Sequence, residues 1–316
     1  MSGAAQRKFM RYVIFILVMA ALAVAAVFLR QFDLNTPKLA LGNGVESALD
    51  WAIIYLSPAL ETIKLGISKV FKALEVFFLW VPWPVWVVFV GLLAWRLVSL
   101  GTGLLLGGGL LIIQLVQLWD EAMSTVALVG TAVLLAIILA IPIGIIASRS
   151  NRIDAVIRPI LDAMQTIPSL IYLIPVVMLL GVGKVPAVLA TMVFGMPPAI
   201  RLTNLGLRQV PADVKEAARA FGASGWQMLV KVELPLALRT IMAGVNQSTM
   251  MSVSMVIIAA FIGAGGLGYS VLLALNRVRV GAGFEAGLAI LAIAIVLDRL
   301  TQALSRVGQP VVKRSE

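Results

Sequence analysis

Few residues in this chain could carry acid–base, redox or metal chemistry. The 316-residue sequence contains no Cys and no His, which removes disulfides, thiolate catalysis, the commonest general base and most zinc sites. Ionisable residues are scarce in the apolar segments, and those of the last segment, Glu285, Asp298 and Arg299, lie near its ends. Groups at such positions are expected to reach the aqueous boundary or to pair. The sequence therefore predicts no catalytic residue and no metal site.

Two glycine-rich stretches match nucleotide-binding motifs only formally. Gly263-x-Gly265-x-x-Gly268 has dinucleotide-fingerprint spacing, but it follows a long apolar helix rather than a β-strand. Residues 107–109 are three glycines without the Lys-Ser/Thr pair of a phosphate loop. We expect the first stretch to turn the chain at the outer membrane face and the second to allow close helix packing. The chain is thus expected to hold no cofactor of its own.

The densest polar pattern lies at residues 210–235. Asp213 is followed three residues later by Glu216, which is the spacing of a helix-capping box, and the same spacing starts again at Ser224. Gly222 lies between the two boxes and can adopt the positive φ that ends many helices. We therefore expect a helix over residues 214–221, a glycine turn, and a second helix directly after it.

The second of these helices is expected to finish by residue 234, because Pro235 disfavours helix in the residue before it. Ala217, Ala218 and Phe221 would form a face of mostly small side chains on the first helix. Small side chains let the backbone of another protein approach closely. Capping patterns are common at helix starts, so a simple connector and a docking site explain the spacing about equally well.

The composition of the chain indicates a membrane protein. Hydrophobic residues make up 61% and charged residues 13%, which is more apolar surface than a water-soluble domain of this size can bury. The formal net charge is +10, but the Lys and Arg residues lie mostly at the ends of apolar segments, where positive charge orients membrane proteins. A nucleic-acid groove would gather them on one face, so no nucleic-acid partner is expected.

Apolar runs and their flanking charges predict about eight transmembrane helices, with both chain termini in the cytoplasm. We expect a bend at Pro142 in the fourth, breaks at Pro168 and Pro175 in the fifth, and a break at Pro197-Pro198 in the sixth. The expected spans are residues 12–29, 80–96, 101–118, 123–147, 167–182, 185–203, 241–262 and 285–304.

The N-terminal region leaves alternatives open. Residues 12–29 follow a basic stretch and predict a retained anchor, although Ala21-Leu22-Ala23 also fits a signal-peptidase site. Residues 30–57 are polar and irregular, and Pro58 is expected to open a helix. Residues 60–77 of that helix separate into an apolar and a charged face. We expect it on the outer membrane surface or against neighbouring spans, with a soluble outer helix as the weaker alternative.

A set of further patterns accompanies residues 210–235. They are Glu216-Ala217-Ala218 with Gly222 and Val232-x-Leu234-Pro235, then Met164–Ser169, Pro197–Thr203, Gly244–Gln247, Ile262–Gly268 and Leu297–Gln302. Together they resemble permease subunits of binding-protein-dependent ABC importers, in the glycine betaine/proline betaine (osmoprotectant, quaternary amine) branch, over roughly residues 120–305. Val232 stands where the family usually has Ile, and Arg239 and Arg279 also depart from the expected pattern.

The resemblance implies an all-α membrane fold whose last five spans form a type I ABC importer (MetI-like) core. It implies an N-terminal part at residues 1–119 with an anchor, an amphipathic helix and two accessory spans. The permease core would occupy residues 120–307 and contain a cytosolic coupling loop at 204–240, and a cytosolic tail would follow at 308–316. The chain would be a transport subunit of the bacterial inner membrane rather than an enzyme, importing glycine betaine or a related osmoprotectant.

The resemblance also implies partners. Two copies of an ATP-binding subunit would hold the ATP and Mg²⁺, an extracytoplasmic binding protein would deliver the substrate, and a second permease copy would complete the path through the lipid. In this family the coupling loop is seated in a groove of the ATPase subunit. The residues assigned to that loop are Asp213, Glu216, Ala217, Ala218, Phe221, Gly222, Ser224 and Pro235.

The translocation path itself is less defined. The last five spans carry too few aromatic residues for an obvious cation–π cage, so we expect selection mainly in the binding protein and weak binding along the path. Hydrogen bonding between helices explains the candidate lining residues about equally well. The candidates are Thr166, Tyr172, Asn246, Gln247, Thr249, Ser252 and Ser254.

Two alternatives to this function remain. The same architecture could import choline, proline betaine or trimethylamine oxide instead. From another class, the chain could be an ATP-independent secondary carrier or channel. Ion-driven carriers normally place acidic residues or broken-helix ion sites at the membrane midplane, and the sequence supplies no clear coupling carboxylate there. A purely structural scaffold would not need proline-broken helices in consecutive spans.

Overall fold

The computed structural model describes residues 3–29 and 41–307, and every element in these ranges is helical. Residues 30–40 and the expected tail at 308–316 lie outside the described residues. Contacts divide the chain into two units, Met1–Ala48 and Leu49–Glu316. The first unit contains α1 (Gly3–Leu29) and the start of α2 (Leu41–Trp80).

The larger unit continues α2 and contains the remaining helices. These are α3 (Trp83–Leu97), α4 (Leu100–Leu115), α5 (Trp119–Arg149), α6 (Asn151–Thr166), the 3₁₀ helix η1 (Ser169–Tyr172), α7 (Leu173–Leu180), α8 (Lys184–Arg208), α9 (Ala212–Ala220), α10 (Gly225–Gln227), the π-helix η2 (Met228–Glu233), α11 (Leu234–Ala259), the 3₁₀ helix η3 (Ala260–Ile262), α12 (Gly266–Asn276) and α13 (Val280–Val307).

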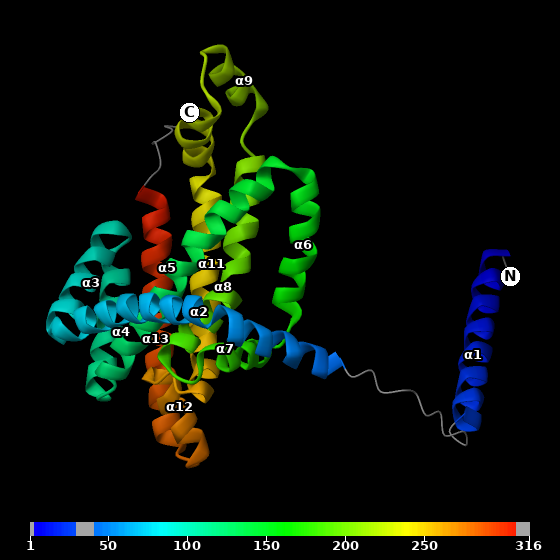
Figure 1. Ribbon diagram of the computed structural model, residues 1–316, viewed down its shortest axis with the longest axis horizontal. Coiled ribbons are helices and arrows are strands. Elements are labelled where there is room, and N and C mark those ends of the chain that lie inside the picture. Colours follow the sequence, from blue (N-terminus) through cyan, green and yellow to red (C-terminus); the bar gives the residue numbers. More distant parts are fainter. Residues whose placement is uncertain (1–2, 30–40, 308–316) are drawn as a thin grey trace. The chain divides into compact units, whose positions relative to one another are not determined.

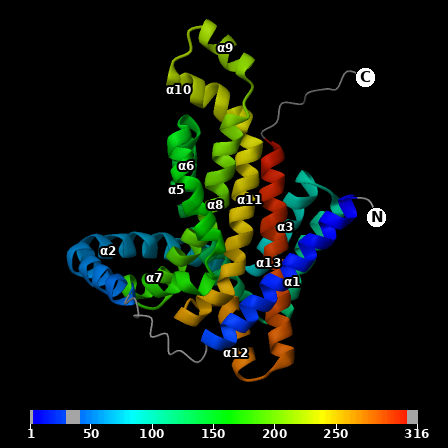
Figure 2. The same ribbon diagram turned by 90° about the vertical axis from the view of Figure 1, so that its right-hand side faces the viewer.

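Helices α8 and α11 form the centre of the larger unit, with α5 beside α8 (Figures 1 and 2). The membrane-length stretch of α8 is 67% buried, whereas that of α13 is 22% buried. A Cβ on Gly195 of α8 would lie 2.6 Å from Ser252 Oγ of α11, and a Cβ on Gly244 of α11 would lie 3.1 Å from Ala199 Cα of α8. Only glycine permits such close contact, so α8 and α11 pack backbone against backbone, as small-residue faces do in membrane bundles.

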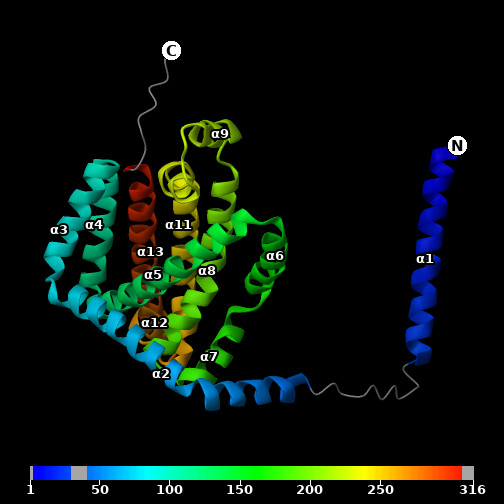
Figure 3. The same cartoon turned by 45° about the horizontal axis from the view of Figure 1, so that its top comes forward.

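Helix α2 runs across the other helices of the larger unit (Figures 1 and 3). Ile67 and Phe71 of α2 are buried in the core. Glu75 Oε1 accepts hydrogen bonds from Lys184 Nζ of α8 at 2.5 Å and from Ser124 Oγ of α5 at 2.6 Å. The expected amphipathic helix is therefore present and packs against its neighbours.

The expected start of this helix at Pro58 is wrong. Helix α2 begins at Leu41 and contains Pro58 in its interior, so residues 41–57 are helical rather than irregular. A proline removes one backbone hydrogen bond and crowds the preceding turn. The regular helical turns on both sides tolerate that single loss here, and α2 then ends at Trp80, where the chain bends by 95° into α3.

The prolines in the other helices act less strongly than expected. Helix α8 continues through Pro197 and Pro198, so the predicted break of the sixth span is wrong. The break at Pro168 is confirmed, because α6 and the segment from η1 to α7 meet there at 109°. Pro175 lies within α7 and does not break the chain. Membrane bundles accommodate helix prolines because neighbouring groups satisfy the freed carbonyls.

Helix length alone accounts for fewer membrane spans in the described residues than the eight expected. In the described residues four helices are long and apolar enough to cross a membrane, or up to six if each of the two bent pairs is one span. Helices α3 and α4 have 15 and 16 residues, somewhat short for a full crossing. The bent fifth element also begins at Asn151 rather than at residue 167. The total of eight stays a prediction.

The two ends of the larger unit differ in structure. Helices α9 and α10 project from one end, and α12 lies at the other (Figures 1 and 2). At the α12 end, Gly263, Gly265 and Gly266 have φ of +80°, +74° and +66°, a region that L side chains rarely adopt. The prediction that this glycine motif turns the chain is confirmed. The helix α12 after it was not predicted; its Leu267 N–H donates to Thr125 Oγ1 of α5 at 2.8 Å.

Candidate functional site

Residues 209–233 form a hairpin at one end of the bundle, called the polar hairpin below. It follows α8, passes through α9, Gly222, α10 and η2, and enters α11 (Figure 2). Gly222 has a φ of +79°, and its N–H donates to the carbonyl of Arg219 at 2.9 Å. The predicted order of helix, glycine turn and helix is confirmed, although α9 begins at Ala212 rather than at residue 214.

The two predicted capping boxes have different outcomes. Ser224 Oγ accepts from the Gln227 N–H at 3.3 Å and Gln227 Oε1 accepts from the Ser224 N–H at 2.9 Å, so the second box is confirmed. The first box is wrong, because Pro211 occupies the N-cap of α9 and makes no side-chain cap. Asp213 instead lies in the first turn, where a carboxylate is favoured by the helix dipole.

Pro235 does not end the second helix, contrary to the prediction. The chain from Gly225 to Ile262 forms one helix of 38 residues, with Pro235 in the first turn of α11. The π-helical turn η2 ends at Glu233, two residues before this proline. A π-turn pairs each N–H five residues back instead of four, and this change in register accommodates the missing N–H of Pro235 within a continuous helix.

The polar hairpin presents aromatic side chains to its surroundings. Phe221 is 93% exposed and Trp226 is 72% exposed. Glu216 and Ala217 of α9 are exposed as well, and Ala218 is half-buried. Sequence analysis missed Trp226, because aromatic residues are also common in cores and nothing in its neighbours distinguishes the two. Exposed aromatic residues on a polar segment are typical of protein-binding surfaces.

Two buried carboxylates stabilise the base of the hairpin, and sequence analysis missed both. Glu233 pairs with Arg149 at the end of α5 and with Lys215 of α9. Asp154 of α6 is also buried and accepts a hydrogen bond from Asn204 Nδ2 of α8 at 2.7 Å. The sequence gives one clue for Glu233, which is an acidic residue inside the apolar run before Pro235. Buried carboxylates need such partners.

The predicted path residues do not gather in one place. On α11, Thr249 and Ser252 are buried, and each hydroxyl donates to the carbonyl four residues earlier at 2.9 Å. Gln247 and Ser254 are exposed and lie seven residues apart, so they share one helix face. The polar candidates of α11 thus divide between two buried residues with a packing role and two residues on an open face.

The other three candidates are one further residue of α11 and two residues outside it. Asn246 Nδ2 donates to Asp298 Oδ1 of α13 at 3.0 Å. The Tyr172 hydroxyl donates to a backbone carbonyl of α6, and its ring packs edge-on against Phe194 with 5.7 Å between centroids. Thr166 is exposed at the end of α6. Asn246 and Tyr172 therefore connect helices, which leaves Thr166, Gln247 and Ser254 as the exposed candidates.

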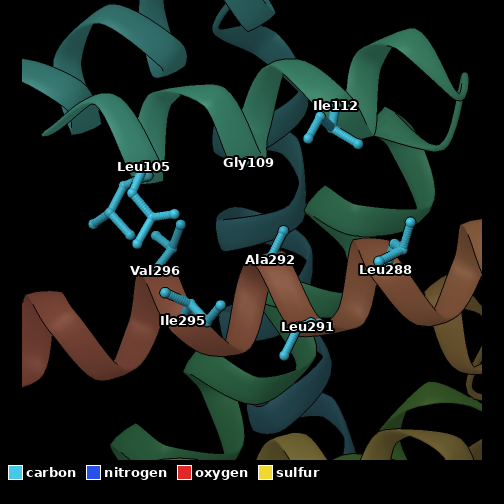
Figure 4. Close-up of a pocket in the computed structure, with 9 residues that line it drawn as sticks. Leu105, Gly109, Ile112, Leu288, Leu291, Ala292, Ile295 and Val296 are labelled. Carbon is cyan, nitrogen blue, oxygen red and sulfur yellow. The ribbon is translucent and has the colours of Figure 1, made fainter. Parts of the chain in front are cut away.

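A separate apolar groove lies between α4 and α13 (Figure 4). Its side chains offer no polar group, so the groove could not bind a charged or zwitterionic solute through hydrogen bonds or ion pairs. We do not assign it to the translocation path. It is lined by Leu105, Leu106, Gly109, Ile112, Leu288, Leu291, Ala292, Ile295 and Val296.

These observations define the class of the protein. Membrane-length helices surround a centre in which glycines bring α8 and α11 into close contact. One polar hairpin with exposed aromatic residues projects from the end of this bundle. The chain is therefore a multi-pass α-helical membrane protein with a polar hairpin projecting from one end of its bundle (Figure 1).

Comparison with known proteins places the chain in a family. Residues 140–307 match the family described as binding-protein-dependent transport system inner membrane component, and the chain belongs to this family. It is 45% identical over 266 residues to the glycine betaine/proline betaine transport system permease protein ProW of Escherichia coli (strain K12), covering 84% of this chain and 75% of that protein. It is 41% identical to the glycine betaine transport system permease protein OpuAB of Bacillus subtilis (strain 168), covering 84% and 94%.

Further similarities extend to other named transporters. The chain is 40% identical to the trimethylamine N-oxide transport system permease protein TmoV of Pelagibacter ubique (strain HTCC1062), over 70% of this chain and 31% of that protein. Its fold is similar to a chain of the inward-facing MetNI methionine ABC transporter, with a TM-score of 0.54, 19% identity, and coverage of 59% of this chain and 93% of that one. The predicted all-α fold with a MetI-like core is confirmed.

Proposed function

We propose that this permease subunit moves glycine betaine or a related quaternary amine across the bacterial inner membrane, driven by ATP hydrolysis in a separate subunit. The polar hairpin carries the proposal. It is too polar for lipid, exposes Phe221 and Trp226, and continues at both ends into the central helices α8 and α11. A partner that binds and moves this hairpin would therefore act directly on the centre of the bundle.

An ATP-binding subunit is the partner that fits this role. The sequence contains no phosphate-loop motif, so the energy for transport has to come from outside the chain. ATP and Mg²⁺ would bind in that partner, with one copy on each of two permeases. In this assignment Glu216, Ala217 and Phe221 face the partner, while Gly222 and Ser224 shape the turn. Asp213, Ala218 and Pro235 support the same loop.

The distribution of positive charge supports a cytoplasmic position for the hairpin. Arg149, Arg152, Arg208, Arg219 and Lys231 belong to the hairpin or to the adjoining helix ends. Cytoplasmic loops of membrane proteins carry an excess of Lys and Arg. With the hairpin inside, the α12 end would face the extracytoplasmic binding protein, and both chain termini would lie in the cytoplasm.

The exposed polar residues of α11 support a path shared by two copies. Gln247 and Ser254 lie on an open face of a membrane-length helix. A polar side chain facing lipid is unfavourable without a hydrogen-bond partner. The Ser254 hydroxyl already donates to the Met250 carbonyl at 3.1 Å, so it is chiefly the Gln247 amide that needs partners. A second permease copy enclosing a water-filled path would supply them, and the exposed Thr166 of α6 would contribute to the same path.

We take the proposed substrate class from the names of the similar proteins. ProW and OpuAB are named for glycine betaine, and TmoV for trimethylamine N-oxide. These solutes share a small nitrogen centre without an N–H donor. The aromatic contact between Tyr172 and Phe194 is a single pair, less than the cage that usually holds such groups. We therefore propose that the binding protein makes the main selection between substrates. Choline and proline betaine are alternative substrates, which a competition assay would compare with glycine betaine.

Co-purification with the cognate ATPase subunit tests the proposal. Gly222→Trp places a bulky group on the hairpin turn at a φ of +79°, and we expect it to abolish ATPase association while the chain still inserts. Gly181→Trp is the matched control, because Gly181 has a φ of +77° and a Cβ at either glycine meets nothing within 4 Å; Gly181 precedes α8, at the end of that helix opposite to the hairpin. Normal coupled transport by Gly222→Trp would contradict the docking assignment. Ion-gradient-driven uptake by the wild-type chain alone would instead support a secondary carrier.

A further inference from the structure

One buried charge cluster lies beneath the proposed docking surface and takes no part in it. We call Glu233, Arg149 and Lys215 the Glu233 cluster. Glu233 is 3% exposed. Its two carboxylate oxygens accept from Arg149 Nη1 at 3.1 Å and Nη2 at 2.5 Å, and Lys215 Nζ lies 3.6 Å from Oε1. A bidentate arginine–carboxylate pair fixes distance and orientation together.

The Glu233 cluster joins four helical segments at one point. Glu233 ends η2 where the chain enters α11, and Arg149 is the last residue of α5. Lys215 comes from α9, and its Nζ also donates to the carbonyl of Leu207 near the end of α8, at 3.2 Å. The cluster therefore connects the hairpin helix α9 to the ends of α5 and α11 through Glu233, and to the end of α8 through Lys215.

Helix α9 depends on this connection because its other contacts are weak. No residue of α9 is fully buried. Apolar packing therefore contributes little to its position, whereas packing supplies most helix stability in proteins. The chain connections at its ends and the Lys215 contacts are what hold α9 against the bundle. Loss of the charge at position 233 would leave α9 held only by its chain connections and the Lys215–Leu207 hydrogen bond, and therefore less firmly tied to α5 and α11.

We propose that Glu233 is a positioning residue for energy coupling, which makes α9 move as one body with the adjoining ends of α5, α8 and α11. The inference rests on the proposed function, in which an ATPase subunit binds the polar hairpin. A displacement of α9 by that partner would then be transmitted to the spans through the Glu233 cluster. Being buried, Glu233 itself would touch neither the ATPase subunit nor the solute.

The test uses the complete complex of permease, ATPase subunit and binding protein in vesicles, with glycine betaine uptake and ATP hydrolysis measured together. Glu233→Gln keeps the side-chain size and removes the charge. We expect uptake per ATP hydrolysed to fall at least about fivefold, the lower end of typical coupling between sites, with ATPase association retained. Glu233→Asp restores the carboxylate and is expected to recover part of the ratio.

Two further variants keep the test decisive. Lys215→Met removes the contacts of α9 with Glu233 and Leu207 but leaves the Arg149–Glu233 pair intact. We expect the same fall in the ratio of uptake to ATP hydrolysis. This variant therefore tests the inference even if Glu233→Gln fails to fold. Glu285→Gln makes the same carboxylate-to-amide change at an exposed position near the α12 end and should keep the wild-type ratio.

The outcomes separate the inference from the proposed function. An unchanged uptake-to-hydrolysis ratio in Lys215→Met and in a folded Glu233→Gln overturns the positioning role. So does an equal fall in uptake and hydrolysis, because that result indicates only a smaller amount of active complex. Absence of ATP-dependent uptake by the wild-type complex would refute the proposed function itself.

Discussion

The contact between α8 and α11 is so close that one methyl group should disturb it. In Gly195→Ala the new Cβ would lie 2.6 Å from Ser252 Oγ and 3.1 Å from the Ser248 carbonyl oxygen, whereas ordinary van der Waals contact begins at 3.4 Å. Overpacking of this kind costs about 1–3 kcal/mol. Alanine is intrinsically better than glycine in a helix by up to about 1 kcal/mol. We therefore expect a net loss of up to about 2 kcal/mol in unfolding free energy, and a loss of about 1–3 kcal/mol relative to a helical Gly→Ala change that meets no neighbour.

A second substitution tests whether this loss is steric. Ser252→Ala removes the Oγ and leaves Cβ at position 252, which lies 3.9 Å from the new methyl. Alone it removes one hydrogen bond within α11, which costs about 0.6 kcal/mol on average in membrane helices. The double variant should therefore be more stable than the two single effects predict by about 1 kcal/mol, a typical interaction energy for residues in contact.

Reversible unfolding in mixed detergent micelles, followed by circular dichroism and tryptophan fluorescence, provides the measurement. Gly130→Ala in α5 is the matched control, because its Cβ would meet nothing within 4 Å, and it should be neutral or stabilise by up to about 1 kcal/mol. Equal stability of Gly195→Ala and Gly130→Ala would refute the close packing of α8 and α11. Strict additivity with Ser252→Ala would refute the specific contact.

Two more predictions follow from the hydrogen-bonded and exposed residues. Glu75→Gln should weaken the attachment of α2 by about 1–2 kcal/mol, because Lys184 loses its charged partner; faster hydrogen exchange in α2 but not in α11 would confirm it, and unchanged exchange would contradict it. In the cysteine-free chain, single cysteines at Gln247 and Ser254 should react with a membrane-impermeant maleimide in the assembled transporter, whereas one at Thr249 should not. Equal reactivity at all three positions would contradict the proposed open face.

The hairpin could be predicted from sequence because its determinants are local. Gly222 lies at the position where a short helix needs a positive φ, and Ser224 makes its cap within three residues. The cap of α9 was misassigned because Pro211 and Asp213 both suit a helix start. Only the path of the preceding chain decides between them, and that path depends on the end of α8, which the local pattern does not contain.

The effect of the prolines and the orientation of the polar residues depend on packing instead. Pro197 and Pro198 weaken a helix in water, but in a bilayer a broken backbone loses its hydrogen bonds without gaining water. Helix α8 therefore stays continuous. On α11, Thr249 and Ser254 look equivalent in an apolar helix, and only the packing of α11 against its neighbours decides that the first is buried and the second exposed.

The route of the chain suggests why the hairpin is an effective place to apply force. Helix α8 leads into the hairpin, and the hairpin leads into α11 within a single helix of 38 residues. These same two helices pack backbone against backbone at Gly195 and Gly244. A displacement of the hairpin would therefore move α8 and α11 together, since close packing resists sliding between them. Helix α13 is only 22% buried over its membrane-length stretch, so relative motion is expected there rather than within the central pair.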